Sequence, residues 1–188
     1  MHSIWKTSIR FTLVTAILLG LGYPLFVTSV AALIFPHQAA GSLILKDGTV
    51  IGSELLAQSF TSDKYFHPRP SAAGNGYDAT ASGGSNLAQS SKTLVDRIQG
   101  SIDKLSAENP GKPVPIDLVT TSASGLDPDI TPNAAIFQAP RVAKARGIPE
   151  DRVRDLIQQH ITTRQLGVLG EPRVNVLLLN LDLDKFAK

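Results

Sequence analysis

The chain has 188 residues, of which 43% are hydrophobic and 18% charged, as in folded rather than disordered proteins. Its net charge of +2 comes from Lys6 and Arg10, because the residues after 35 carry 16 basic and 16 acidic side chains. A neutral body argues against nucleic-acid binding, and the absence of cysteine excludes disulfides, thiolate metal sites and a cysteine nucleophile.

Residues 11–35 form an uninterrupted run without an ionised side chain. As a helix this run would reach about 37 Å, enough to cross roughly 30 Å of hydrocarbon. Lys6 and Arg10 precede the run and only Lys46 follows closely, so the positive-inside rule predicts cytoplasmic residues 1–10 and an exported domain over 36–188. A cleaved signal peptide ending at Ser29-Val30-Ala31 is the alternative, but the apolar run is long for one.

Every fourth residue of the span is small or proline, which would let another helix approach closely in lipid. The row consists of Thr12, Ala16, Gly20, Pro24, Thr28 and Ala32. We therefore predict that the span packs against partner helices and that Pro24 kinks it.

The first part of the exported domain predicts a hairpin, a short helix and a long loop. Two apolar triplets flank Lys46-Asp47-Gly48, which is typical of a hairpin turn over 43–51. A short helix is expected over 54–57. Alternating prolines in 65–71 and small residues in 72–86 predict a long irregular segment.

The middle of the chain predicts helices separated by a strand and a second loop. Apolar residues recur at helical spacing from Leu87 to Asn109, and 116–119 has the composition of a strand. A loop over 122–131 leads to Thr131, a helix cap. Pro140 should divide the following helix in two, and Gly147 should end it.

The last part predicts a helix from Pro149 to His160 and a central strand within 174–181. Helices and strands are mixed without regular alternation. The predicted class is therefore α+β, with one N-terminal transmembrane helix and one mixed α/β domain.

Catalytic motifs are not found in the sequence, which contains no phosphate-binding loop, HExxH or GxSxG pattern. This favours a non-enzymatic chain. The glycine-rich segment Ser82, Gly83, Gly84, Ser85 and Asn86 could hold an anion or nucleotide at a helix start, or could simply cap that helix through Ser85 or Asn86.

Four loop residues have side chains that could contact a partner. Asp127 and Asp129 could share a cation, although carboxylates around Pro128 more often shape a turn. His67 and Arg69 could bind a partner subunit or be solvated. The basic residues around 141–157 also permit a helix-turn-helix, so a membrane-anchored DNA-binding regulator is the alternative function.

Several segments together resemble one family. They are YFHPRPSA at 65–72, SGGSNL at 82–87, SASGLDPDI at 122–130, RVAKARG at 141–147 and LGEPRVNVLLLNL at 169–181. With the N-terminal span, they are similar to the C subunit of Kdp-type potassium-transporting ATPases, the KdpC family.

The resemblance implies an accessory subunit of a bacterial inner-membrane complex that imports potassium using ATP. Its partners would be a channel-like subunit, a P-type ATPase subunit and a small membrane subunit. It also implies a role in assembly and as a catalytic chaperone that raises the ATP affinity of the ATPase subunit. An exported domain would not meet cytosolic ATP, so that effect would be allosteric.

Overall fold

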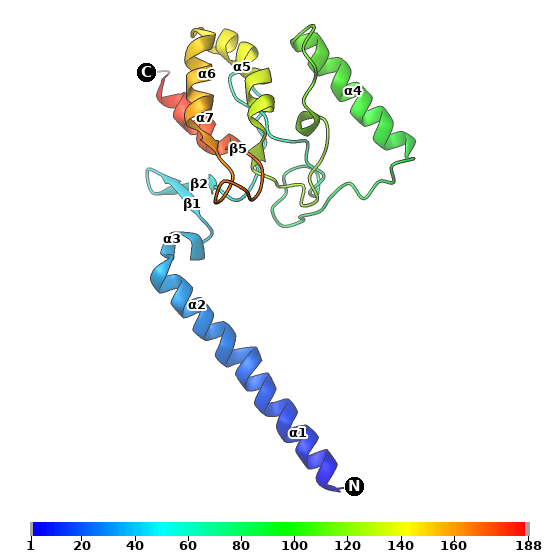
Figure 1. The fold of residues 1–188 in the computed structure, drawn as a ribbon, viewed down its shortest axis with the longest axis vertical. Coiled ribbons are helices and arrows are strands. Elements are labelled where there is room, and N and C mark those ends of the chain that lie inside the picture. Colours follow the sequence, from blue (N-terminus) through cyan, green and yellow to red (C-terminus); the bar gives the residue numbers. More distant parts are fainter. Residues whose placement is uncertain (1, 187–188) are drawn as a thin grey trace. The chain divides into compact units, whose positions relative to one another are not determined.

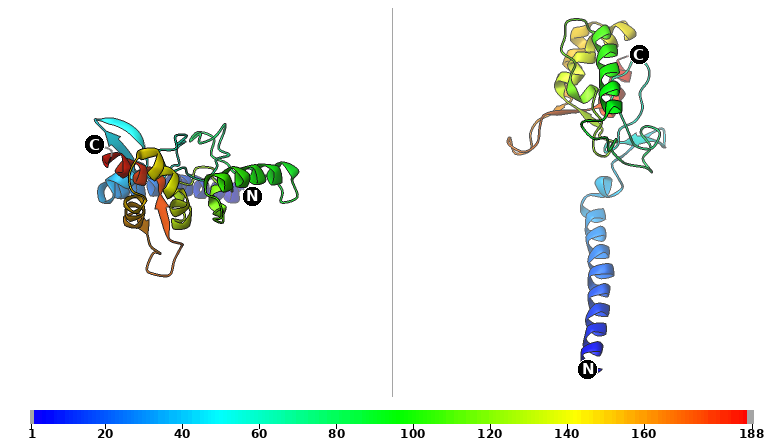
Figure 2. Two further views of the ribbon diagram at one scale, coloured as in Figure 1. Left: turned by 90° about the horizontal axis from the view of Figure 1, so that it is seen from above. Right: turned by 90° about the vertical axis from the view of Figure 1, so that its right-hand side faces the viewer.

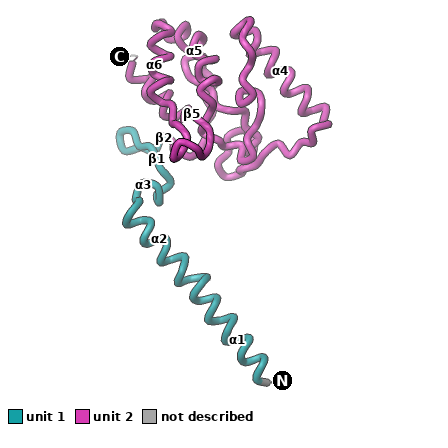
Figure 3. Tube along the Cα trace, viewed as in Figure 1, with its two compact units in different colours: residues 1–51 teal, residues 52–188 magenta. Residues whose placement is uncertain are grey.

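The computed structural model describes residues 2–186, which form two compact units, 1–51 and 52–188 (Figure 3). In the first unit, α1 (His2–Ile17), the π-helical turn η1 (Leu18–Gly22) and α2 (Tyr23–Ile34) follow one another without a break (Figure 1). Residues 3–34 are long and apolar enough to cross a membrane. The predicted N-terminal apolar helix and the α+β class are therefore confirmed, and the crossing of a membrane stays a prediction.

The bend predicted at Pro24 stays a prediction, but the helix does not end at this proline. The turn before it widens instead, so that the Tyr23 amide donates to the Leu18 carbonyl five residues back. A π-helical turn of this kind redistributes the hydrogen bonds next to a residue that has no amide hydrogen. Pro24 then occupies the first turn of α2, where its missing hydrogen is tolerated.

The hairpin prediction is confirmed by the strand pair that follows α3 (Pro36–Ala39). The strands β1 (Leu43–Lys46) and β2 (Thr49–Ser53) form a two-stranded sheet. Both turn residues, Asp47 and Gly48, have positive φ angles of 52° and 76°. Two consecutive residues in this conformation are what an Asp-Gly hairpin turn requires.

The predicted short helix at 54–57 is wrong, because these residues form a turn. The Leu56 amide donates to the Ser53 carbonyl, while the Ala57 amide donates to the Leu126 carbonyl at 2.9 Å. That long-range bond draws Ala57 toward the second loop, so helical hydrogen bonding cannot continue.

Over its described residues, 52–186, the second unit contains four α-helices and a small sheet (Figures 1 and 2). The helices are α4 (Lys92–Glu108), α5 (Pro132–Arg146), α6 (Glu150–Gln159) and α7 (Val176–Lys185), and a 3₁₀ turn η2 spans Ile116–Leu118. The predicted strand at 116–119 is therefore wrong. Pro115 sets the chain for a tight turn, and the buried Asp117 carboxylate accepts hydrogen bonds from the Thr131 amide and hydroxyl.

Pro140 lies inside α5 and does not divide it, contrary to the prediction. Ala139, Val142 and Ala143 flank it and are buried in the core. Their packing against α6 and α7 stabilises the helix enough to offset one missing hydrogen bond. The predicted ends are confirmed, because the Thr131 hydroxyl accepts from the Ala134 amide and Gly147 adopts the left-handed conformation.

The predicted strand over 174–181 is only partly confirmed. β5 (Arg173–Asn175) is the central strand between β3 (Asp129–Ile130) and β4 (Ile161–Thr162), paired antiparallel with both. It ends at Asn175, whose side chain caps α7 by accepting from the Leu178 amide at 3.1 Å. The remaining apolar residues of the run are helical, which a short apolar segment does not reveal by periodicity.

The core lies where α5, α6, α7 and β5 meet. Val174 aligns with Ile130 on one neighbouring strand and Ile161 on the other, and Val174 is fully buried. The largest fully buried apolar side chains are Phe66, Ile157, Leu179, Leu183, Val142, Val153, Val174 and Val176. Phe66 belongs to the long irregular segment, so that segment is part of the core.

Replacing the α7 cap tests this description. We expect Asn175→Ala to lower the free energy of unfolding of the full chain in detergent by about 1 kcal/mol or more, because both the cap and a bond from Asn175 to the Glu54 carbonyl are lost. The measurement is urea denaturation. Ser91→Ala is the matched control, since Ser91 precedes α4 without a side-chain cap bond among the described residues; an equal loss in both variants would contradict the capping role.

Candidate functional site: a packed loop cluster

Two buried side-chain amides hold the backbone of the segment that contains His67 and Arg69. Asn180 on α7 accepts from the Phe66 amide and donates to the Phe66 carbonyl, each at 2.9 Å. Gln138 on α5 accepts from the His67 amide at 2.8 Å and donates to the His67 carbonyl at 3.1 Å. The two residues thus replace the partner strand that a proline-rich segment cannot have.

Two arginines of α5 also hold this segment, and the guanidinium of Arg141 donates to the Gln138 side-chain oxygen at 2.7 Å. Arg141 donates to the carbonyls of Asp63 and Tyr65 at 2.8 and 3.0 Å. Arg146 donates to the Lys64 carbonyl and to the Asp184 carboxylate, both at 2.7 Å, and lies 4.8 Å from the centre of the Tyr65 ring. These side chains are only 12% and 7% exposed, so they are structural parts of the domain.

Those contacts change the interpretation of the basic residues at 141–157. A helix-turn-helix would direct its cations toward phosphates, but Arg141 and Arg146 bind the chain itself and Arg154 pairs with Glu150. The helix pair predicted at this position does form from α5 and α6. Arg141 and Arg146 therefore do not contribute to a solvated basic face.

Arg69 joins the first long loop to the second. Its guanidinium donates to the Asp127 carboxylate at 3.1 Å and lies 3.4 Å from the carbonyls of Thr120 and Thr121. The Asp127 carboxylate also accepts from the Asp129 amide at 3.1 Å, which is the turn-shaping contact considered for these carboxylates.

The structure brings Asp127 and Asp129 near each other but gives each its own arginine. Asp129 pairs with Arg173 at 2.9 Å. Burial raises the pKa of the Asp129 carboxyl, with the Arg173 charge opposing this. Within residues 2–186, the structure shows no group of three or more potential metal ligands, so a shared cation between the two carboxylates stays a prediction.

Serines and glycines fasten the two loops together. The Ser71 hydroxyl donates to the Gly125 carbonyl at 2.6 Å, and the Gly83 amide donates to the Ser124 carbonyl at 2.9 Å. A Cβ at Gly125 would lie 2.5 Å from the Gly83 carbonyl oxygen, and its φ is +66°. Only glycine fits this contact, which explains why the glycine-rich motifs at 82–87 and 122–130 occur together.

The predicted helix start at Leu87 is wrong, since α4 begins at Lys92. Ser82–Asn86 therefore form an irregular segment, and neither Ser85 nor Asn86 caps a helix. The Ser82 hydroxyl and the Gly83 amide both donate to the Ser124 carbonyl. Nucleotide binding here stays a prediction, but its rationale of free amides at a helix start no longer applies.

We name residues 63–86 and 120–129 the loop cluster. Its polar groups are largely engaged with one another: the Tyr77 hydroxyl donates to the Arg69 carbonyl at 2.9 Å, and the His67 ring lies 3.1 Å from the Ser62 carbonyl. Burial raises the pKa of the Tyr77 hydroxyl. This arrangement holds the two loops in a fixed conformation.

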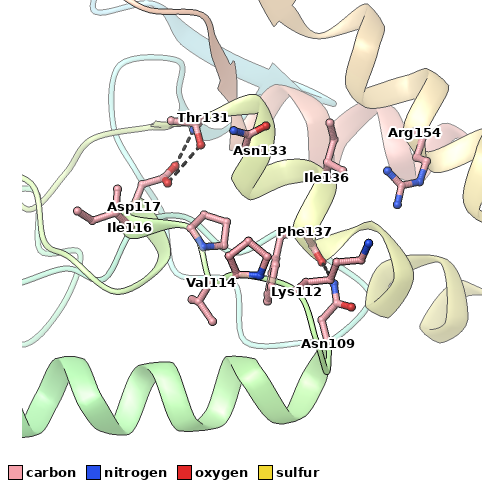
Figure 4. A pocket seen from close by; sticks show the side chains of 12 residues that line it. Asn109, Lys112, Val114, Ile116, Asp117, Thr131, Asn133, Ile136, Phe137 and Arg154 are labelled. Carbon is pink, nitrogen blue, oxygen red and sulfur yellow. Dashed lines mark hydrogen bonds between the residues drawn. The ribbon is translucent and has the colours of Figure 1, made fainter.

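A cleft of about 590 Å³ lies beside the loop cluster and was not anticipated from the sequence. Figure 4 shows Ile116, Ile136 and Phe137 in its lining, with Lys112 and Arg154 as its cationic residues. Asp117, also in the lining, is held by Thr131. The one sequence signal for the cleft is the extended Pro113-Val114-Pro115 segment that forms its wall.

The residues that sequence reasoning missed are the ones that hold the loop cluster, above all Gln138 and Asn180. The exposed fraction of each residue is 3% or less, although both are polar. A polar residue inside an apolar helical stretch is the available signal, because buried amides need partners. The sequence does not reveal which backbone groups those partners are.

Comparison with known proteins gives one family. Residues 5–185 match the family described as "KdpC: K+-transporting ATPase, c chain". Relatives named "Potassium-transporting ATPase KdpC subunit" include one from Acidobacterium capsulatum, 57% identical over 96% of this chain and 97% of its own length. Others are from Rhodopseudomonas palustris, 56% identical over 95% and 96%, and Methylobacterium nodulans, 55% identical over 91% of each chain.

The half-buried position of His67 predicts a pH dependence. Burial, with the Arg141 charge next, lowers the pKa of His67 below its ordinary 6.5. As the pH falls below 6.5, His67 gains a proton in the unfolded chain but not yet in the folded chain. The free energy of unfolding therefore decreases as the pH is lowered, until the pH reaches the lowered pKa of His67 in the folded chain. We expect urea titrations of the full chain in detergent to show this loss, and His67→Asn to reduce it.

The comparison of the two pH profiles isolates His67 from other titrating groups. The difference in unfolding free energy between the native chain and His67→Asn should shrink as the pH falls from 7 through 6.5. Parallel profiles would contradict the prediction.

Proposed function

The chain belongs to the KdpC family of potassium-transporting ATPase subunits, and from that premise we propose that it is a non-catalytic assembly subunit. Its span would pack against helices of partner subunits, and the loop cluster with its surrounding domain would dock on them outside the cytoplasm. The proposed partners are a channel-like subunit, a P-type ATPase subunit and a small membrane subunit in the inner membrane of a bacterium.

The observation that carries this proposal is the apolar helix over residues 3–34. Large side chains along it, such as Trp5, Leu19 and Phe26, are between 67% and 69% exposed. Apolar surface of this extent requires lipid or other helices around it.

The π-helical turn supports packing through the row of small residues. In a regular α-helix, a residue every fourth position drifts by about 40° per step, or about 200° from Thr12 to Ala32. A π-helical turn contains one more residue than an α-helical turn for the same rotation about the axis. The drift of the row is therefore smaller by the rotation of one residue, which leaves about 100°. The row therefore lies closer to one face, as a helix contact through small residues needs.

The domain's internal contacts support a docking role. Because Arg69, Arg141 and Arg146 are bound within the domain, their charges hold a fixed surface. We propose that the raised ATP affinity of the ATPase subunit is an allosteric coupling, transmitted through the span or the docked domain rather than through nucleotide bound here.

Bulky substitutions test the packing of the span. Ala16→Leu and Gly20→Leu should reduce recovery of partner subunits with this chain roughly tenfold, because larger side chains prevent close approach of helices. The measurement is quantitative co-purification from detergent-solubilised membranes, with potassium-dependent ATP hydrolysis of the recovered complex.

Val14→Phe is the matched control, because residue 14 lies on the opposite face from Ala16 and the substitution also adds bulk. It should leave recovery unchanged. Normal recovery with both leucine variants, or an equal loss with Val14→Phe, would contradict packing through the row.

A topology measurement tests the orientation. Since the chain has no cysteine, Ser106→Cys on the exposed face of α4 creates a single labelling site, and Ser8→Cys marks the N-terminal side. In cells with a permeabilised outer layer and an intact inner membrane, an impermeant thiol reagent should label residue 106 but not residue 8. The reverse pattern would refute the exported placement.

A further inference from the structure

The loop between β4 and β5 projects away from the rest of the second unit in both views of Figure 2. Its backbone is ordered by a bridge in which Gln165 and Leu169 exchange two hydrogen bonds of 2.8 and 2.9 Å. At its base, Arg164 pairs with Glu171 at 2.6 Å. We name residues 164–171 the β4–β5 hairpin, a preformed projection.

The turn at its tip is one in which leucine is disfavoured. Leu166 and Gly167 have φ angles of 52° and 76°, the pair of left-handed residues for which Asn-Gly is the usual choice. Leucine rarely adopts this conformation, and its apolar side chain is 90% exposed. Neither local geometry nor core packing explains a leucine at this position, and such positions are characteristic of function.

The tip carries two further exposed apolar residues. Val168 is 71% and Leu169 is 56% exposed. These three exposed apolar residues lie within four consecutive positions at the end of the hairpin, and clustered exposed apolar residues of this kind mark interaction sites. Gly167 between them and Gly170 after them add no charge, so the tip is uncharged.

The chemistry of the tip distinguishes among possible occupants. Segments that insert into a bilayer surface carry Trp, Tyr and unpaired basic residues, whereas residues 165–170 have none and the nearby Arg164 is neutralised by Glu171. A second copy joined through this tip alone would contribute three apolar side chains, whereas a stable interface buries roughly 800 Å² and about 20–30 residues on each partner. A small rigid projection is instead suited to fill a pocket on another protein, as one part of a larger interface between the two.

We propose that the β4–β5 hairpin is a docking element that inserts Leu166, Val168 and Leu169 into an apolar, uncharged pocket on another subunit of the same ATPase complex. The inference rests on the proposed function, because it names one contact of the assembly subunit. The complementary pocket carries no net charge, since a charge buried against the three side chains would lack a partner.

A substitution at the tip separates docking from folding. Asn adopts the left-handed conformation readily, so Leu166→Asn preserves the turn and removes the apolar side chain. We expect the thermal unfolding of the variant chain alone to be unchanged or slightly raised, while its dissociation from the assembled complex becomes about tenfold faster. Val95→Gln, at a 56% exposed residue of α4, is the control and should change neither.

A labelling measurement identifies the occupant. Leu166→Cys and Val95→Cys are treated with a thiol reagent in the chain alone, in the chain reconstituted in lipid vesicles, and in the purified complex. Residue 166 should be protected at least tenfold in the complex only, and residue 95 in none of the three.

Each other outcome overturns the proposal. Protection of residue 166 by vesicles alone would assign the tip to lipid, and protection of the chain alone that rises with its concentration would assign it to a second copy. Equal labelling in the complex and in the chain alone would show that the tip is not docked. Failure of the unmodified chain to assemble would count instead against the proposed function.

Discussion

The second unit depends on two pairs of hydrogen bonds between buried amides and a segment that cannot form a strand. Asn180 and Gln138 each bind both backbone groups of one residue, Phe66 and His67, in the same manner as a neighbouring strand would. Because buried polar groups must be paired, this arrangement allows the Phe66 side chain to enter the core and fixes the path of the loops that follow. The loop cluster is ordered as a result, although it contains little regular secondary structure.

The positions of the exposed apolar residues and of the internally paired arginines bear on the function of the chain. In the domain, arginines that could bind another protein instead bind groups of this chain. Arg146, for example, donates to the Lys64 carbonyl and to the Asp184 carboxylate. The exposed features are apolar: the helix over residues 3–34 and the tip at Leu166. Exposed apolar surface of this kind is consistent with a subunit of a larger assembly, and the matching family is described as the c chain of a K+-transporting ATPase.

Local features were predictable because they depend on residues close in the chain. The spanning helix follows from an uninterrupted apolar run, the hairpin from Asp47-Gly48, and the limits of α5 from Thr131 and Gly147. Each is determined by backbone preferences or by a cap within a few residues. The family resemblance was equally accessible, since its motifs are contiguous segments of the sequence.

Tertiary structure alone decided the rest. Asn180 is 114 residues from Phe66, so no local pattern could identify it as the partner of that backbone. The run after Val174 becomes helix because Asn175 caps it and the core packs against it, and α5 continues through Pro140 for the same reason of burial. The amino-acid sequence determined the N-terminal apolar helix, the turns and the family. Long-range packing determined which polar residues hold the loops and which apolar residues remain exposed, because burial is a property of the folded chain.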